Sequence, residues 1–148
     1  MAAGAGEEYL VETDFLFGLR AGDRNFEAVV GALRRCKSGA IKLSVPSSSV
    51  VEARAVLYSK GLKPNEVEVA LGLMGAKLAE NGVMDFIQIE LADAVYAERL
   101  RIENPNLGFF DSLHAAAAAR RGKLLLTSNK AYKGITSLKV RDLSDFIP

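Results

Sequence analysis

Short apolar runs alternate along this chain with longer segments in which apolar residues recur every three or four positions. The short runs predict buried strands, because continuous apolar runs of about four to eight residues are typical of a sheet covered on both faces. These strands are expected at residues 9–12, 41–45, 84–89 and 123–127, with an edge strand near 138–140. The periodic segments predict helices at residues 13–20, 25–37, 47–61, 65–82, 91–103 and 110–122, with a short one at 129–133.

Strands that alternate with helices predict crossover connections and therefore a parallel sheet. We expect an α/β fold of three layers, in which a central parallel sheet of four or five strands is flanked by helices. Ligands of such sheets bind beyond the carboxyl ends of the strands. Functional side chains should therefore follow the strands or lie in the first turns of the helices after them.

Composition narrows the class of protein. The chain has 148 residues, 49% of them hydrophobic and 25% charged, which suits one soluble domain. We expect a flexible lead-in at residues 1–8 and a single domain at 9–148. The one cysteine, Cys36, cannot form an internal disulfide, which favours a reducing, cytoplasmic setting and excludes a cysteine-rich zinc site. No apolar run reaches the roughly 18 residues of a membrane span, so no membrane partner is expected.

Charge also restricts the partners. The formal net charge of +1 excludes the strong positive field of a protein that coats duplexes, but a near-neutral total can hide a local basic groove.

Five polar residues stand where a sheet of this kind would place a functional site. Glu12 and Asp14 follow the first strand, Glu52 and Asp111 lie in the first turns of later helices, and Asn129 follows the fourth strand. Their oxygen atoms are hard ligands, which suit Mg²⁺ or Mn²⁺ better than zinc. Carboxylates clustered without a cation would repel one another, whereas a bound cation could activate water and stabilise charge on a phosphate.

The same residues also fit a structural role, because short polar side chains cap helices. Ser49 and Glu52 have the spacing of a capping box. The other helices could be capped by Thr13 or Asp14, by Asp111, and by Ser128 or Asn129. Spacing alone leaves the caps and the cation site as alternatives.

Other residues near these positions also have two interpretations. His114, one helical turn after Asp111, could contact a phosphate or tune Asp111, or could be a partly buried histidine on a packed helix. Lys130 and Lys133 follow Asn129, where they could meet a phosphate backbone or belong to a solvated face.

The helix expected at 65–82 is apolar around most of its circumference. It therefore predicts either deep burial or contact with a partner.

Four segments carry a resemblance to a known family: YLVETDFLF, SSSVVEARAVL, FFDSLHAAAAA and LLLTSNKAY. In order and spacing, from Tyr9 to Ile147, the chain resembles the PIN-domain ribonucleases, especially the VapC-like toxins of VapBC toxin–antitoxin systems. FFDSLHAAAA is the most specific of the matches. The resemblance implies a PIN-like fold and a divalent-metal-dependent endoribonuclease that cleaves single-stranded RNA by attack of water. It also implies a homodimer and an antitoxin protein as a partner.

The resemblance further implies a role for each matching residue. Glu12, Glu52 and Asp111 would be catalytic and would bind Mg²⁺ or Mn²⁺ with Asn129, supported by Asp14 and Thr127, while Lys130 and Lys133 would bind substrate. Two positions depart from the family pattern: Glu12 stands where an aspartate is usual, and Asn129 replaces the aspartate of a Thr-x-Asp motif. These departures keep an alternative open, a degenerate PIN domain that binds RNA or protein without cleavage.

Within the opening segment, we expect the strand to end at Glu12. Thr13 should then begin the turn, and Asp14 should enter the helix, where it caps the helix or braces the site from its flank.

Overall fold

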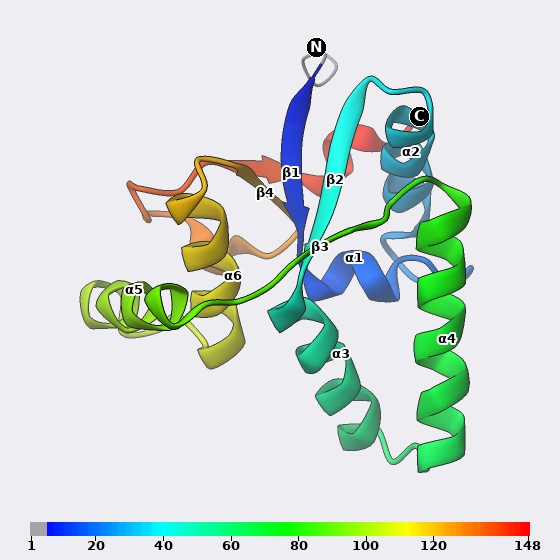
Figure 1. Cartoon of the computed structure of the whole chain (residues 1–148), viewed down its shortest axis with the longest axis horizontal. Coiled ribbons are helices and arrows are strands. Elements are labelled where there is room, and N and C mark those ends of the chain that lie inside the picture. Colours follow the sequence, from blue (N-terminus) through cyan, green and yellow to red (C-terminus); the bar gives the residue numbers. More distant parts are fainter. Residues whose placement is uncertain (1–5) are drawn as a thin grey trace.

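A parallel sheet of five strands forms the centre of the structure, a computed structural model that describes residues 6–148. The strands lie in the order β3-β2-β1-β4-β5, and every neighbouring pair is parallel. Their bounds are Glu7–Val11 for β1, Ile41–Pro46 for β2, Asp85–Ile87 for β3, Leu124–Thr127 for β4 and Val140–Asp142 for β5. The expected α/β architecture is thus confirmed, with β1 at the centre (Figure 1).

The helices follow the predicted segments closely. They are α1 (Thr13–Phe17), α2 (Phe26–Lys37), α3 (Ser47–Ser59), α4 (Pro64–Glu80), α5 (Leu91–Glu103), α6 (Phe109–Arg120) and the short 3-10 helices η1 (Lys130–Tyr132) and η2 (Leu143–Phe146). Helix η2 was not expected from the sequence, and it begins where the Asp142 side chain accepts a hydrogen bond from Ser144 N. The expected lead-in lies outside the described residues up to position 5, and its last two residues, Glu7 and Glu8, belong to β1.

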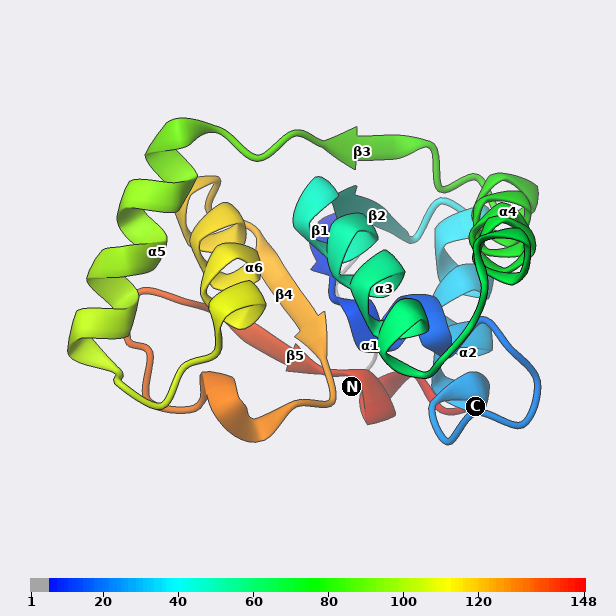
Figure 2. The same ribbon diagram turned by 90° about the horizontal axis from the view of Figure 1, so that it is seen from below.

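Alternate residues of the central strands face two separate cores. In β1, Tyr9 and Val11 pack with α2 and η2 on one face, whereas Leu10 packs with α5 and α6 on the other. In β4, Leu126 joins the first core and Leu125 the second. Figure 2 shows the two groups of helices on opposite sides of the sheet. Burial on both faces explains why these strands read as continuous apolar runs.

A buried ion-pair network fixes α6 against α5. Asp93 is fully buried and accepts hydrogen bonds from Arg120 at 2.7 Å and from Arg121 at 2.8 Å. Burial opposes the charge on Asp93, but the bonds from Arg121, from the Glu90 backbone and from Arg120 outweigh it and lower its pKa to about 2. The network therefore holds the helix that carries Asp111.

Helix α4 is less buried than its apolar sequence suggests. Val67 and Leu78 are buried, but Val69 and Leu73 are 60% and 62% exposed. Deep burial is therefore the wrong alternative, because only part of the apolar surface of this helix packs on the domain. In the part of the chain that the structure describes, no helix combines the length and apolar character needed to cross a membrane.

Candidate metal centre

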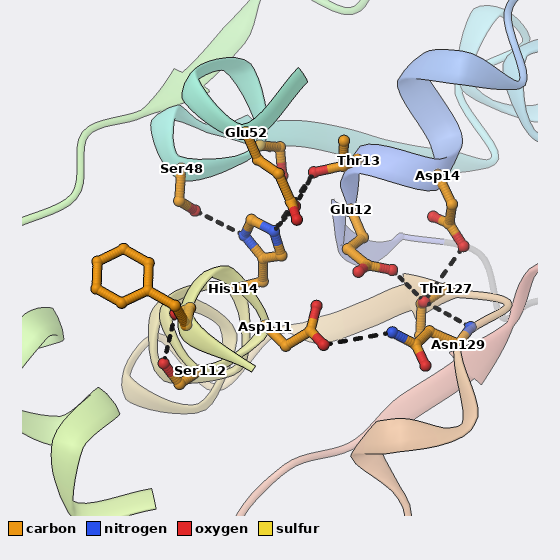
Figure 3. Close-up of polar contacts among 12 residues, drawn as sticks. Glu12, Thr13, Asp14, Ser48, Glu52, Asp111, Ser112, His114, Thr127 and Asn129 are labelled. Atoms are coloured by element: carbon orange, nitrogen blue, oxygen red, sulfur yellow. Dashed lines mark hydrogen bonds and ion pairs between the residues drawn. The ribbon is translucent and has the colours of Figure 1, made fainter. Parts of the chain in front are cut away.

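Three carboxylates converge at the carboxyl ends of the central strands. Glu12 follows β1, Glu52 lies in α3, which follows β2, and Asp111 lies in the first turn of α6. One ligand atom from each of these residues and one from His114 all lie within 4.8 Å of one another. Figure 3 shows the three acids pointing into one space from three different elements.

The break between β1 and α1 places the first acids. β1 ends at Val11, Glu12 keeps an extended backbone as the residue before the helix, and Thr13 begins α1. Asp14 then turns toward the end of β4, where one carboxylate oxygen accepts hydrogen bonds from Ser128 N at 2.8 Å and Ser128 Oγ at 2.7 Å. Asp14 thus braces the flank of the site and makes no side-chain cap of α1.

The ionised form of Glu12 is unfavourable in the folded protein. Its side chain is 4% exposed and accepts hydrogen bonds from the hydroxyls of Thr127 and Tyr132. Burial, followed by the negative charges of Asp14 and Asp111, raises the pKa of Glu12 to about 8 against the opposing hydrogen bonds. A cation beside Glu12 would remove this penalty on the ionised form.

Tyr132 links two of the acids and was missed in the sequence. Its hydroxyl lies 3.0 Å from Glu12 Oε1 and 3.2 Å from Asp111 Oδ1, and the residue is buried. Burial and the charges of both acids raise the pKa of Tyr132 far above its usual range, so the phenol keeps its proton. The available signal was its place in TSNKAY, where the turn of η1 returns it to the site.

Glu52 is held by a buried histidine, His114. His114 is fully buried, as the packed-helix interpretation predicts, and its Nε2 lies 2.8 Å from Glu52 Oε1, so the acid that it contacts is Glu52 and not Asp111. The Thr13 hydroxyl donates to the same oxygen. Burial raises the pKa of Glu52, but the hydrogen bonds from His114 and Thr13 outweigh it, and the pKa is lowered. Glu52 is therefore ready to act as an anion.

Two of the helix caps that the sequence allowed are absent from the part of the chain that the structure describes. Helix α3 begins at Ser47, and Ser49 donates a hydrogen bond to the Val11 carbonyl oxygen at 3.0 Å, so the capping box with Glu52 is wrong. Gly108 precedes α6, so Asp111 is not its N-cap.

Asn129 does cap a helix. Its side-chain oxygen accepts a hydrogen bond from Ala131 N at 2.9 Å, at the start of η1. Its amide nitrogen faces Asp111 Oδ2 at 3.5 Å. The cap therefore occupies the oxygen that a cation would need, and the role of Asn129 as a ligand stays a prediction.

The two candidate substrate lysines border a cavity beside the acids. Lys130 and Lys133 are both exposed, and with Thr127, Ser128 and Tyr132 they line a space of about 240 Å³. Lys130 Nζ also lies 3.1 Å from Asp142 Oδ2. Such exposed ion pairs exchange readily with solvent, so Lys130 stays available to an anion at this edge.

The residues present fit a hard divalent cation. Glu12, Glu52 and Asp111 offer carboxylate oxygens, the donor type that Mg²⁺ and Mn²⁺ prefer. Asp14 adds a further sign of unmet charge, because its Oδ1 is buried without a hydrogen-bond partner among residues 6–148. Three acids so close together, with Asp14 on their flank, are best compensated by positive charge.

Comparison with known proteins identifies the fold. No protein-family model matches the sequence, and no curated protein matches it. One solved structure that is similar is VapBC2 from Rickettsia felis bound to a DNA fragment, with 19% identity over 91% of this chain and 98% of that one, at a TM-score of 0.67. A toxin–antitoxin complex from Klebsiella pneumoniae matches with 20% identity over 91% and 97%, at a TM-score of 0.59.

A third structure links the fold to a described activity. VapC20 from Mycobacterium tuberculosis, a toxin that cleaves the sarcin-ricin loop, matches with 16% identity over 79% of this chain and 86% of that one, at a TM-score of 0.55. At these identities the likeness shows the fold. The chain therefore has the PIN-like fold of the VapC toxins.

Proposed function

We propose that this protein is a divalent-metal-dependent endoribonuclease that cleaves single-stranded RNA in the cytoplasm. The observation that carries the proposal is the convergence of Glu12, Glu52 and Asp111, whose ligand atoms lie within 4.8 Å at the carboxyl edge of a PIN-like sheet. The fold shared with VapC20, a toxin that cleaves the sarcin-ricin loop, supports the choice of RNA.

In this proposal the three acids hold Mg²⁺ or Mn²⁺, and Asn129 lies at the border of that set. A cation held by these acids would supply polarisation of a phosphate ester and easier ionisation of water. Thr127 and Tyr132 fix both oxygens of Glu12, so the acid cannot rotate away from the site. Lys130 and Lys133 bind the RNA backbone beside it, where their charge positions a phosphate without reading the base.

The test is cleavage of labelled single-stranded RNA by the purified protein in Mg²⁺, in Mn²⁺ and in a chelator. We expect fragments with either metal and none in the chelator, because the acids cannot bind a phosphate without a cation. Cleavage that persists in the chelator would contradict the proposal. RNA binding without cleavage in either metal would favour the alternative of a degenerate domain, for which the neutral Asn129 is the supporting observation.

We also infer that the protein is the toxin of a toxin–antitoxin pair and forms a homodimer. A partner is supported by an apolar groove of about 470 Å³ between α1, α3 and α4, lined among others by Leu16, Phe17, Leu57, Val69, Leu73 and Met74. Val69 and Leu73 are exposed there, and such surface is unfavourable in water unless a partner covers it. The structural neighbour from Klebsiella pneumoniae is itself a toxin–antitoxin complex.

Replacing Leu73 by glutamate is expected to abolish binding of the antitoxin, because a charge in an apolar groove must lose its hydration. The measurement is co-purification, after co-expression, with any small protein whose gene adjoins that of this chain. Leu91→Glu is the matched control, since Leu91 is 83% exposed on α5 and does not line the groove. If both variants retain the partner equally, the groove is not the docking site.

A further inference from the structure

His114 connects two positions on the same face of a neighbouring helix. Its Nδ1 lies 2.8 Å from Ser48 Oγ and its Nε2 lies 2.8 Å from Glu52 Oε1. Ser48 and Glu52 both belong to α3 and stand four residues apart, one above the other on the helix. The imidazole of α6 therefore bridges one turn of α3 from inside the protein, as Figure 3 shows.

The partners of the ring decide where its proton lies. An ionised carboxylate only accepts hydrogen bonds, so His114 Nε2 must carry a proton to bond Glu52. In the neutral ring Nδ1 is then an acceptor, and the Ser48 hydroxyl donates to it. Ser48 and His114 are 2% and 0% exposed, so water does not compete for the bond between them.

This arrangement leaves the two oxygens of Glu52 unequal. Oε1 receives hydrogen bonds from both Thr13 and His114. Among the described residues, no hydrogen bond reaches Oε2. Glu52 is only partly buried, with 21% of its side chain accessible, so without these two donors it could swing toward solvent.

The other two acids are held by different groups. Thr127 and Tyr132 fix Glu12, and Tyr132 also reaches Asp111. Neither of these donors touches Glu52, so the third acid depends on its own support from Thr13 and His114. Removing His114 should therefore affect Glu52 without disturbing the contacts of Glu12.

We propose that His114 is a positioning residue, which holds Glu52 Oε1 through Nε2–H so that Oε2 faces Glu12 and Asp111. This inference rests on the proposed function for its effect on cation binding, but the proton position that it requires does not. Ser48 supports this role of His114, because its bond to Nδ1 selects the tautomer in which Nε2 carries the proton. His114 then lies among the four clustered residues as a donor to a ligand and does not itself bind the cation.

Two amide substitutions separate this role from simple packing. The amide nitrogen of His114→Gln can occupy the place of Nε2 and keep the bond to Glu52, whereas that of His114→Asn reaches only the place of Nδ1. We expect His114→Asn to weaken Mn²⁺ binding by about 10- to 100-fold, the usual cost of losing a group that orients a ligand. His114→Gln should retain affinity within about threefold. Isothermal titration with Mn²⁺ measures both, and thermal melts in a chelator confirm that both variants are folded.

His114 is the only histidine in the sequence, which makes the proton position directly measurable. In ¹⁵N-labelled protein without an affinity tag, the imidazole gives one pair of nitrogen signals, which report the nitrogen that carries the proton. Nε2 is expected to be protonated, to remain so when Mg²⁺ is added, and to lose this preference in Ser48→Ala.

The results of these experiments distinguish failure of the positioning role from failure of the proposed function. An unprotonated Nε2, or equal loss of Mn²⁺ affinity in the Gln and Asn variants, would overturn the positioning role. If the unaltered protein binds no Mn²⁺, the proposed metal-dependent function fails, and the proton position alone decides whether His114 holds Glu52.

Discussion

Replacing Asp111 by asparagine should lower the rate of RNA cleavage at least about 100-fold. The amide keeps the size of the side chain and can still accept a bond from Tyr132, but it removes one of the negative charges that would hold a cation. Several kcal/mol of charge stabilisation correspond to this loss in rate. Initial rates on labelled single-stranded RNA in saturating Mn²⁺ measure the effect.

The melting temperature of Asp111→Asn tests whether the loss of a negative charge explains the lower rate. Without metal, Asp111→Asn should melt at the same temperature or higher, because the remaining acids repel one another less. Asp145→Asn is the matched control, since Asp145 pairs with Arg141 on the exposed surface and lies outside the cluster. Unchanged cleavage by Asp111→Asn would show that the acid does not take part in the reaction.

The second large effect is a dependence of stability on pH that originates at Glu12. Its pKa is raised from an ordinary value of 4.5 to about 8 in the folded protein, so the folded state binds this proton more tightly than the unfolded state. The stabilising contribution is fully present below about pH 4.5 and is lost as pH rises to about 8. We expect the metal-free protein to lose on the order of 3 kcal/mol of unfolding free energy over this range.

Added cation should reverse the trend. A cation binds the ionised carboxylate, so the increase in melting temperature caused by Mn²⁺ should grow as pH rises toward about 8. Thermal melts at a series of pH values, with Mn²⁺ and with a chelator, measure both effects. Glu12→Gln should remove the pH dependence and the response to Mn²⁺ together. A metal-free stability that increases from pH 5 to pH 8 would sink this account of Glu12.

The sequence was sufficient to predict the sheet and the convergence of the acids. Strands buried on both faces carry a strong apolar signal, and parallel strands bring their carboxyl ends to one edge by geometry alone. Glu12 directly follows β1 and Asp111 lies in the first turn of α6, as that rule expects. Glu52 was expected in the first turn of its helix but lies in the second turn of α3, because that helix begins at Ser47.

The hydrogen-bond partners of the acids could not be predicted in this way. They depend on how each helix is rotated on its neighbour, which the periodicity of one segment does not determine. His114 therefore reaches Glu52 across the contact of α6 with α3, although Asp111 is its neighbour on the same helix. Tyr132 was missed because its helix has only three residues, too few to show a buried face in the sequence.

For a similar reason, the sequence did not determine whether the apolar surface of α4 is buried in the domain or exposed. An apolar helix gives the same pattern whether the domain or a partner covers it. Only the packing of Val67 and Leu78, with Leu73 left outside, distinguishes the two.

The site is assembled from residues far apart in the described chain, and this sets when the site of a newly made molecule can be complete. The hydroxyls that hold Glu12 come from Thr127 and Tyr132, which follow it by 115 and 120 residues. On the ribosome, Glu12 and Glu52 emerge first, while β4, which pairs with β1, has yet to be made. A nascent chain that has not reached Asp111 thus holds Glu12 and Glu52 without the hydroxyls and without the third acid, so the site is complete only after Tyr132 has been made.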